Sequence, residues 1–274
     1  MIRVLSLGAG VQSSTLALMA SLGLLNYSVD FAIFADTGAE PRSVYEWLDW
    51  LEKKLTFPVK RVSAGNLRDD LLSTEPGRFA SIPAFTMYSG RVGMTRRQCT
   101  REYKVEPIQR AVRALLGLKH GERGPRTVEV QQLIGISLDE MGRMKDSGKP
   151  YIENVFPLVE MRMTRQHCLD WMQYRGFPRP AKSACTFCPY HDDAMWRDMK
   201  LNDPESFTSA VEVDRALRGD APVRARRGMD GDVFIHRSCK PLEEVDFRSA
   251  EDMGQQSLFD PLGFQNECEG MCGI

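Results

Sequence analysis

The sequence lacks a long apolar run, and no stretch approaches the ~20 residues that a membrane-spanning helix needs. It also lacks a cationic and apolar leader of the secretory type, so we expect a cytoplasmic protein with no membrane partner. An excess of charge of one sign is missing too: 36 Lys and Arg face 37 Asp and Glu. This balance excludes a globally basic nucleic-acid binder and leaves only local arginine clusters.

Seven cysteines are present, an odd number. A cytoplasmic compartment keeps thiols reduced, so this count favours metal binding or catalysis over disulfides.

Apolar patterning predicts an α/β protein with a doubly wound, mostly parallel sheet, because strand-like and helix-like segments alternate. Strands are expected at 2–7, 31–35, 59–62 and 128–136, and helices at 15–25, 43–55, 105–116, 164–174, 194–201 and 204–217. Residues 64–98 look irregular and predict a lid or a substrate loop. We expect a nucleotide-binding domain over 1–200. A less regular extension with a cysteine-containing tail should follow over 201–274.

A run of small residues separates the first expected strand from the first expected helix. Small residues let backbone N–H groups approach an anion, and a helix N-terminus adds partial positive charge. The spacing matches neither a Gly-Lys-Ser/Thr loop nor G-x-G-x-x-G. A tight turn without a ligand is the alternative. The expected phosphate-binding residues are Ser6, Gly8, Ala9, Gly10, Gln12, Ser13 and Ser14.

Two other strand ends carry candidate ligand-binding residues. Asp36, Thr37 and Gly38 follow the second strand, and a strand-end acid in this fold class commonly faces the ligand crevice, so Asp36 is also a candidate catalytic residue. Asp36 could instead cap a turn. Gly135 ends the strand at 128–136 and should lie at the same edge of the sheet.

Cys185 and Cys188 form a C-x-x-C pair, which can supply two ligands to one metal. A reduced pair in a turn and a redox pair are the alternatives. His191 could be a ligand, a proton donor or a capped surface residue. The remaining cysteines divide into candidate ligands and expected core residues: Cys99, Cys268 and Cys272 in the first group, Cys168 and Cys239 in the second.

The loop from Gly8 to Ser13 resembles the PP-loop of ATP pyrophosphatases and phosphoadenylyl-sulfate reductases, in the adenine nucleotide alpha-hydrolase (HUP-type) superfamily. Gly8 replaces the usual Ser and Gln12 the usual Asp. The segment that begins Asp36-Thr37-Gly38 resembles the D-T-G stretch of the same reductases. The resemblance implies ATP with Mg²⁺ as the bound nucleotide.

Residues 96–108 resemble the cysteine segment of iron–sulfur adenylyl-sulfate reductases, which ends in Lys-x-x-Pro. This resemblance implies a [4Fe–4S] cluster on Cys99, Cys185 and Cys188. Cys272 is the expected fourth ligand, with another C-terminal cysteine or an open iron position as alternatives, and zinc as the competing metal. Lys104 becomes a candidate catalytic cation near phosphate or cluster.

The tail segment Glu267-Cys268 resembles the tail that carries the nucleophilic cysteine of the sulfate-pathway reductases, which makes Cys268 a candidate nucleophile. Those reductases also hold the sulfate with an arginine pair, where this chain has Ser137 and Leu138. The loss of two fork-shaped donors favours ATP over a sulfo-nucleotide.

Together these resemblances imply an ATP-pyrophosphatase-type sulfurtransferase that adenylates a nucleic acid, DNA or tRNA, for sulfur insertion. A DNA phosphorothioation system uses a component of this kind, and a cysteine desulfurase would supply the sulfur. The alternatives are a sulfo-nucleotide reductase and a non-catalytic nucleotide- or cluster-binding adaptor. The chain could also pair as a homodimer, but the sequence does not fix the oligomeric state.

Overall fold

The computed structural model describes residues 1–75, 82–88, 90–219, 222–223 and 231–248. The described chain forms two compact units that are not consecutive in sequence. Of the described residues, the first contains Met1–Gly65 and Thr100–Ala184, and the second contains those of Asn66–Cys99 and those from Cys185 to Arg248. The second unit is built from two separate stretches of chain, and the expected division at residue 200 stays a prediction. Cys268 and Cys272 lie outside the described residues.

A five-stranded parallel sheet forms the centre of the first unit. Its order is β3-β2-β1-β6-β7, which confirms the doubly wound α/β fold. The chain reverses its winding direction beside β1, so the carboxyl ends of β1 and β6 flank the topological switch point. The strands are β1 (Ile2–Leu7), β2 (Phe31–Asp36), β3 (Val59–Ser63), β6 (Val130–Ile134) and β7 (Ile152–Val155).

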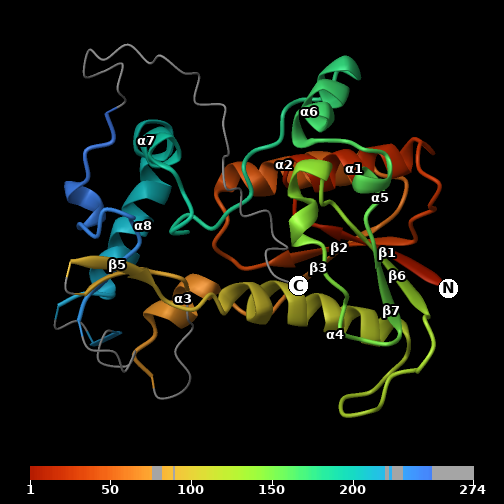
Figure 1. Ribbon diagram of the computed structural model, residues 1–274, viewed down its shortest axis with the longest axis horizontal. Coiled ribbons are helices and arrows are strands. Elements are labelled where there is room, and N and C mark those ends of the chain that lie inside the picture. Colours follow the sequence, from red (N-terminus) through yellow and green to blue (C-terminus); the bar gives the residue numbers. More distant parts are fainter. Residues whose placement is uncertain (76–81, 89, 220–221, 224–230, 249–274) are drawn as a thin grey trace. The chain divides into compact units, whose positions relative to one another are not determined.

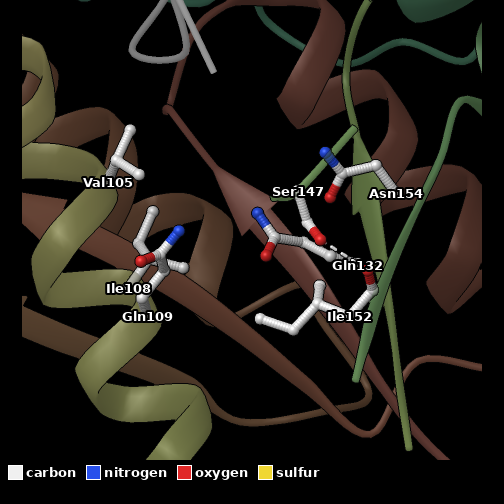
Figure 2. A pocket seen from close by; sticks show the side chains of 7 residues that line it. All are labelled: Val105, Ile108, Gln109, Gln132, Ser147, Ile152 and Asn154. Carbon is white, nitrogen blue, oxygen red and sulfur yellow. Dashed lines mark hydrogen bonds between the residues drawn. The ribbon is translucent and has the colours of Figure 1, made fainter. Parts of the chain in front are cut away.

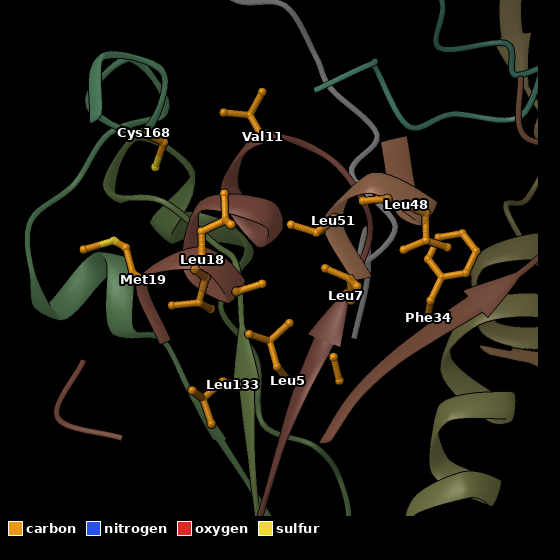
Figure 3. Packing of buried hydrophobic residues seen from close by; sticks show 14 of the residues in the cluster. Leu5, Leu7, Val11, Leu18, Met19, Phe34, Leu48, Leu51, Leu133 and Cys168 are labelled. Atoms are coloured by element: carbon orange, nitrogen blue, oxygen red, sulfur yellow. The ribbon is translucent and has the colours of Figure 1, made fainter. Parts of the chain in front are cut away.

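Helices cover both faces of this sheet (Figure 1). On one face, α1 (Val11–Ser21), α2 (Arg42–Glu52) and α6 (Arg165–Tyr174) enclose an apolar cluster, which Figure 3 shows around Leu5, Leu18 and Leu133. The buried thiol of Cys168 belongs to this cluster, as expected. On the other face, α4 (Glu106–Leu115) packs Ile108 and Val112 against the sheet.

Three short elements join these parts of the first unit. A π-helix, η1 (Arg101–Val105), runs directly into α4. A 3-10 helix, η2 (Leu138–Arg143), follows β6, and α5 (Pro157–Glu160) follows β7. The sequence did not predict β7, because Ile152–Val155 is short and lies among polar and Gly-containing segments.

The second unit contains a small antiparallel sheet of order β5-β4-β8. Its elements are α3 (Leu67–Leu72), β4 (Phe85–Tyr88), β5 (Arg91–Met94), α7 (Asp193–Asn202), α8 (Pro204–Ala216), β8 (Val233–Phe234) and η3 (Leu242–Glu244). The irregular loop expected over 64–98 is thus wrong in part, since it contains a helix and a hairpin. Both are too short to give a clear period. No helix within the described ranges is long and apolar enough to cross a membrane.

Candidate functional site

The loop after β1 has a tightly curved backbone that a ligand can approach closely. Ala9 is fully buried with φ 59°, a left-handed conformation that is uncommon for a residue with a Cβ and is often found at functional sites. Ser13 braces the loop: its Oγ accepts the Gly8 N–H at 3.2 Å and donates to the Gly10 carbonyl at 3.4 Å. The loop therefore keeps its curvature through its own hydrogen bonds.

Helix α1 begins at Val11, earlier than the sequence predicted, so Ser13 and Ser14 lie within its first turn. Gly10 is the N-cap, has no capping side chain, and no acidic residue occupies the first turn. The partial positive charge of the helix N-terminus is thus not neutralised locally. Ser14 is buried and its Oγ accepts the Trp47 Nε1–H at 3.0 Å, while its expected donation to phosphate stays a prediction.

Gly135 lies directly behind this loop. A Cβ at Gly135 would come within 2.8 Å of both Cα and N of Ser13. Only glycine fits there, because backbone atoms cannot give way as a flexible side chain can. The end of β6 therefore touches the loop after β1 at the switch point, where open α/β sheets bind their ligands.

A buried polar network that the sequence did not predict surrounds Gln12. Its Nε2 donates to Ser137 Oγ at 3.4 Å and to Glu140 Oε2 at 3.2 Å, and Glu140 pairs with Arg143. Gln12 Oε1 is buried with no hydrogen-bond partner among the described residues. Buried acceptors are rarely left this way in folded proteins, so a bound donor or cation would satisfy this oxygen.

Asp36 closes the turn that follows β2. Its Oδ1 accepts the Gly38 N–H at 2.8 Å and the Tyr45 hydroxyl at 2.8 Å. Burial, and then the bond to Asp36, raise the pKa of Tyr45 well above its usual range, so this hydroxyl stays a donor. Thr37 is buried beside it. Asp36 Oδ1 therefore caps the turn, which is the alternative that the sequence left open for this residue.

Lys104 and Glu40 form a buried ion pair in the same unit. The Lys104 Nζ lies 3.1 Å from Glu40 Oε1, with side-chain exposures of 12% and 1%. Ser183 Oγ lies 3.3 Å from the other oxygen of Glu40. The π-helix η1 supplies Lys104, and such single π-turns occur frequently at functional sites. Glu40 and Ser183 were not predicted as site residues: Glu40 ends the segment that begins with Asp36 but was given no role, and Ser183 belongs to no motif.

The C-x-x-C pair forms a tight turn in the second unit. The Cys188 N–H donates to the Cys185 carbonyl at 2.9 Å. The Arg97 guanidinium lies 5.0 Å from the ring centroid of Tyr190, which joins the segment of Cys99 to that of Cys188. All three cysteines are half-buried.

Within the described ranges, however, no group of three or more His, Cys, Asp or Glu side chains has a metal-binding arrangement. The turn carries two sulfur donors, Cys185 and Cys188. No third ligand joins them among the described residues. The four-cysteine cluster therefore stays a prediction.

A small recess lies between β6, β7 and the start of α4 (Figure 2). Its cavity volume is about 10 Å³, which is room for about one water molecule and not for a nucleotide. Its lining includes three side-chain amides and consists of Val105, Ile108, Gln109, Gln132, Ser147, Ile152 and Asn154. The loop after β1 is therefore the stronger candidate for the nucleotide site.

No family model matches the chain, and no curated protein matches it either. Among solved structures, it is similar to the phosphoadenylyl-sulfate (PAPS) reductase from Candida auris in its phosphate complex. The identity is 13% and the TM-score 0.40, over 66% of this chain and 75% of that chain. It is also similar to the U34-tRNA thiolase NcsA from Methanococcus maripaludis with its [4Fe-4S] cluster. That identity is 13% and the TM-score 0.39, over 84% of this chain and 74% of the thiolase. At such identity, roles must be argued from the chain's own residues.

Proposed function

We propose that the chain is an ATP-pyrophosphatase-type sulfurtransferase that binds ATP at the loop after β1 and adenylates a nucleic acid for sulfur insertion. The proposal rests on the packing of Gly135 against the backbone of Ser13. This packing supports a ligand-binding role, since it fixes a curved, uncapped helix N-terminus at the switch point. The choice of ATP and of sulfur chemistry comes from the sequence motifs.

In the proposed reaction, backbone N–H groups of residues 9–12 hold the phosphates. An acceptor oxygen attacks the α-phosphorus, a new P–O bond forms, and the bond to pyrophosphate breaks. A sulfur nucleophile then attacks the adenylated centre, and AMP leaves with the oxygen. The proposed role of the Lys104 ammonium, which pairs with Glu40, is to balance phosphate charge by exchanging partners.

The proposed sulfur carrier is a cluster or persulfide on the cysteines of the second unit. A cysteine-held [4Fe–4S] centre would supply a sulfide-binding or sulfur-transferring iron. Within the described residues no third ligand joins Cys185 and Cys188, so the proposed reaction contains no step on the metal. Iron and acid-labile sulfide per chain, measured after anaerobic purification, test this part. Cys185→Ser should remove the metal, whereas Cys168→Ser, in the apolar core, should not.

The experiment for the whole proposal supplies ATP, Mg²⁺ and labelled sulfide with either DNA or bulk tRNA. We expect AMP and pyrophosphate in equal amounts, together with label in one acceptor. Ser13→Ala should slow this reaction because it removes the brace of the loop, while Ser43→Ala, an exposed serine on α2, should leave it unchanged. Sulfite release from a sulfo-nucleotide, without AMP from ATP, would instead identify a reductase. Tight nucleotide binding without turnover would identify an adaptor.

A further inference from the structure

Three polar side chains in the second unit, none of which has a role in the proposed reaction, form a hydrogen-bonded chain. Asp193 Oδ1 lies 3.0 Å from His236 Nε2, and Ser238 Oγ lies 2.8 Å from His236 Nδ1. Asp193 begins helix α7, and the other two residues follow β8. Only 4% of the His236 side chain is exposed, whereas Ser238 is exposed. The chain therefore runs from a buried imidazole to a hydroxyl at the surface.

The backbone fixes the tautomer of this imidazole. The Ser238 N–H also points at His236 Nδ1, at 3.2 Å, and a backbone N–H can only donate. His236 Nδ1 must therefore be the unprotonated nitrogen, and the proton sits on Nε2, facing Asp193. In this state Nδ1 can accept the hydroxyl proton of Ser238, which lies closer than the backbone N–H.

The surroundings hold the three groups in place. A second Asp193 oxygen accepts from Arg237 at 2.7 Å, so the carboxylate cannot turn away. The turn that carries Ser238 is closed by the Cys239 N–H on the His236 carbonyl at 3.0 Å, with Cys239 at φ 52°. A left-handed cysteine persists only where its surroundings enforce it. The edge of the Phe247 ring packs on the imidazole, at a centroid distance of 5.6 Å.

We propose that Asp193, His236 and Ser238 form a second reactive site, in which Ser238 is a nucleophile towards small activated esters. Ser238 Oγ forms a bond to the carbonyl carbon while its proton passes to His236 Nδ1. The bond to the leaving group breaks, and the leaving group takes that proton. Water then attacks the acyl-serine in the same way, which releases the acid and restores the serine.

The test treats the full-length protein with a fluorophosphonate probe and maps the modified serine by mass spectrometry. We expect Ser238 to be modified, Ser238→Ala to abolish this label, and Ser43→Ala to leave it unchanged. His236→Asn should slow labelling of Ser238 about 10²-fold or more, the usual contribution of a general base. Melting curves establish that this variant is folded.

Labelling of Ser238 no faster than labelling of Ser43 in the unaltered protein would overturn the proposal, and so would an unchanged rate in a folded His236→Asn variant. Either result would leave the three residues as a structural link between α7 and the turn after β8. Neither result bears on ATP binding in the first unit.

Discussion

A methyl group at Gly135 offers the sharpest test of whether the loop after β1 binds the nucleotide. In Gly135→Ala the new Cβ would lie 2.8 Å from two backbone atoms of Ser13 and 3.1 Å from the carbonyl carbon of Gln12. Ordinary contact needs roughly 3.4 Å or more, so the loop or the end of β6 must shift by about half an ångström. Overpacking of this kind costs about 1–3 kcal/mol. In a chain of this size, that predicts a fall in melting temperature of roughly 2–10 °C.

The same shift should weaken nucleotide binding, because it moves the backbone donors that the loop presents. We expect ATP affinity, measured by calorimetry with Mg²⁺, to fall at least about tenfold, since ~1.4 kcal/mol corresponds to that factor. Gly142→Ala is the matched control: a Cβ there meets nothing within 4 Å. An unchanged melting temperature in Gly135→Ala would refute the packing argument. A lowered melting temperature with unchanged ATP affinity would instead show that ATP does not bind at this loop.

Other perturbations test single contacts. Tyr45→Phe should lower the free energy of unfolding, measured with urea, at about pH 8. The difference from the unaltered protein should shrink above about pH 10. Burial and then the carboxylate partner raise the folded pKa, so the unfolded chain ionises first. Asp214→Asn should cost about 1–3 kcal/mol in urea unfolding, because both buried oxygens accept backbone N–H groups and an amide satisfies only one. Glu205→Gln, exposed on the same helix, should change stability by less than about 0.5 kcal/mol. Glu40→Gln should lower the melting temperature clearly, since breaking a buried ion pair costs about 3–5 kcal/mol.

Strong periodicity made much of the first unit predictable. The apolar run at Ile2–Leu7 and the amphipathic pattern of Arg42–Glu52 gave elements within a few residues of those observed. The start of α1 was missed because Gly10 acts as N-cap without a side chain, so no capping signal marks it. The hairpin of β4 and β5 was missed because its short strands lie in a stretch that looks irregular.

The candidate site was predictable only where it follows a motif. Glycines and small residues mark the loop, because they are needed for its backbone shape. Glu40 and Glu140 carry no such mark, since their importance depends on partners that are distant in sequence: Lys104 and Gln12. The contact of Ser14 was not predictable for a related reason. Its sequence position does not reveal that Trp47 takes its hydroxyl oxygen.

The charges around the loop bear on which nucleotide it would hold. Gln12 stands where the PP-loops that this loop resembles in sequence carry an aspartate, and its amide donates to Glu140. Glu140 in turn pairs with Arg143, so this arginine brings no net positive charge to the loop. A sulfo-nucleotide is a bare polyanion that needs cationic fork donors. ATP can arrive with its charge partly neutralised by Mg²⁺, and the buried oxygen of Gln12 is a type of ligand that Mg²⁺ accepts. The network of Gln12, Glu140 and Arg143 therefore favours a metal-bound triphosphate over a sulfated adenylate.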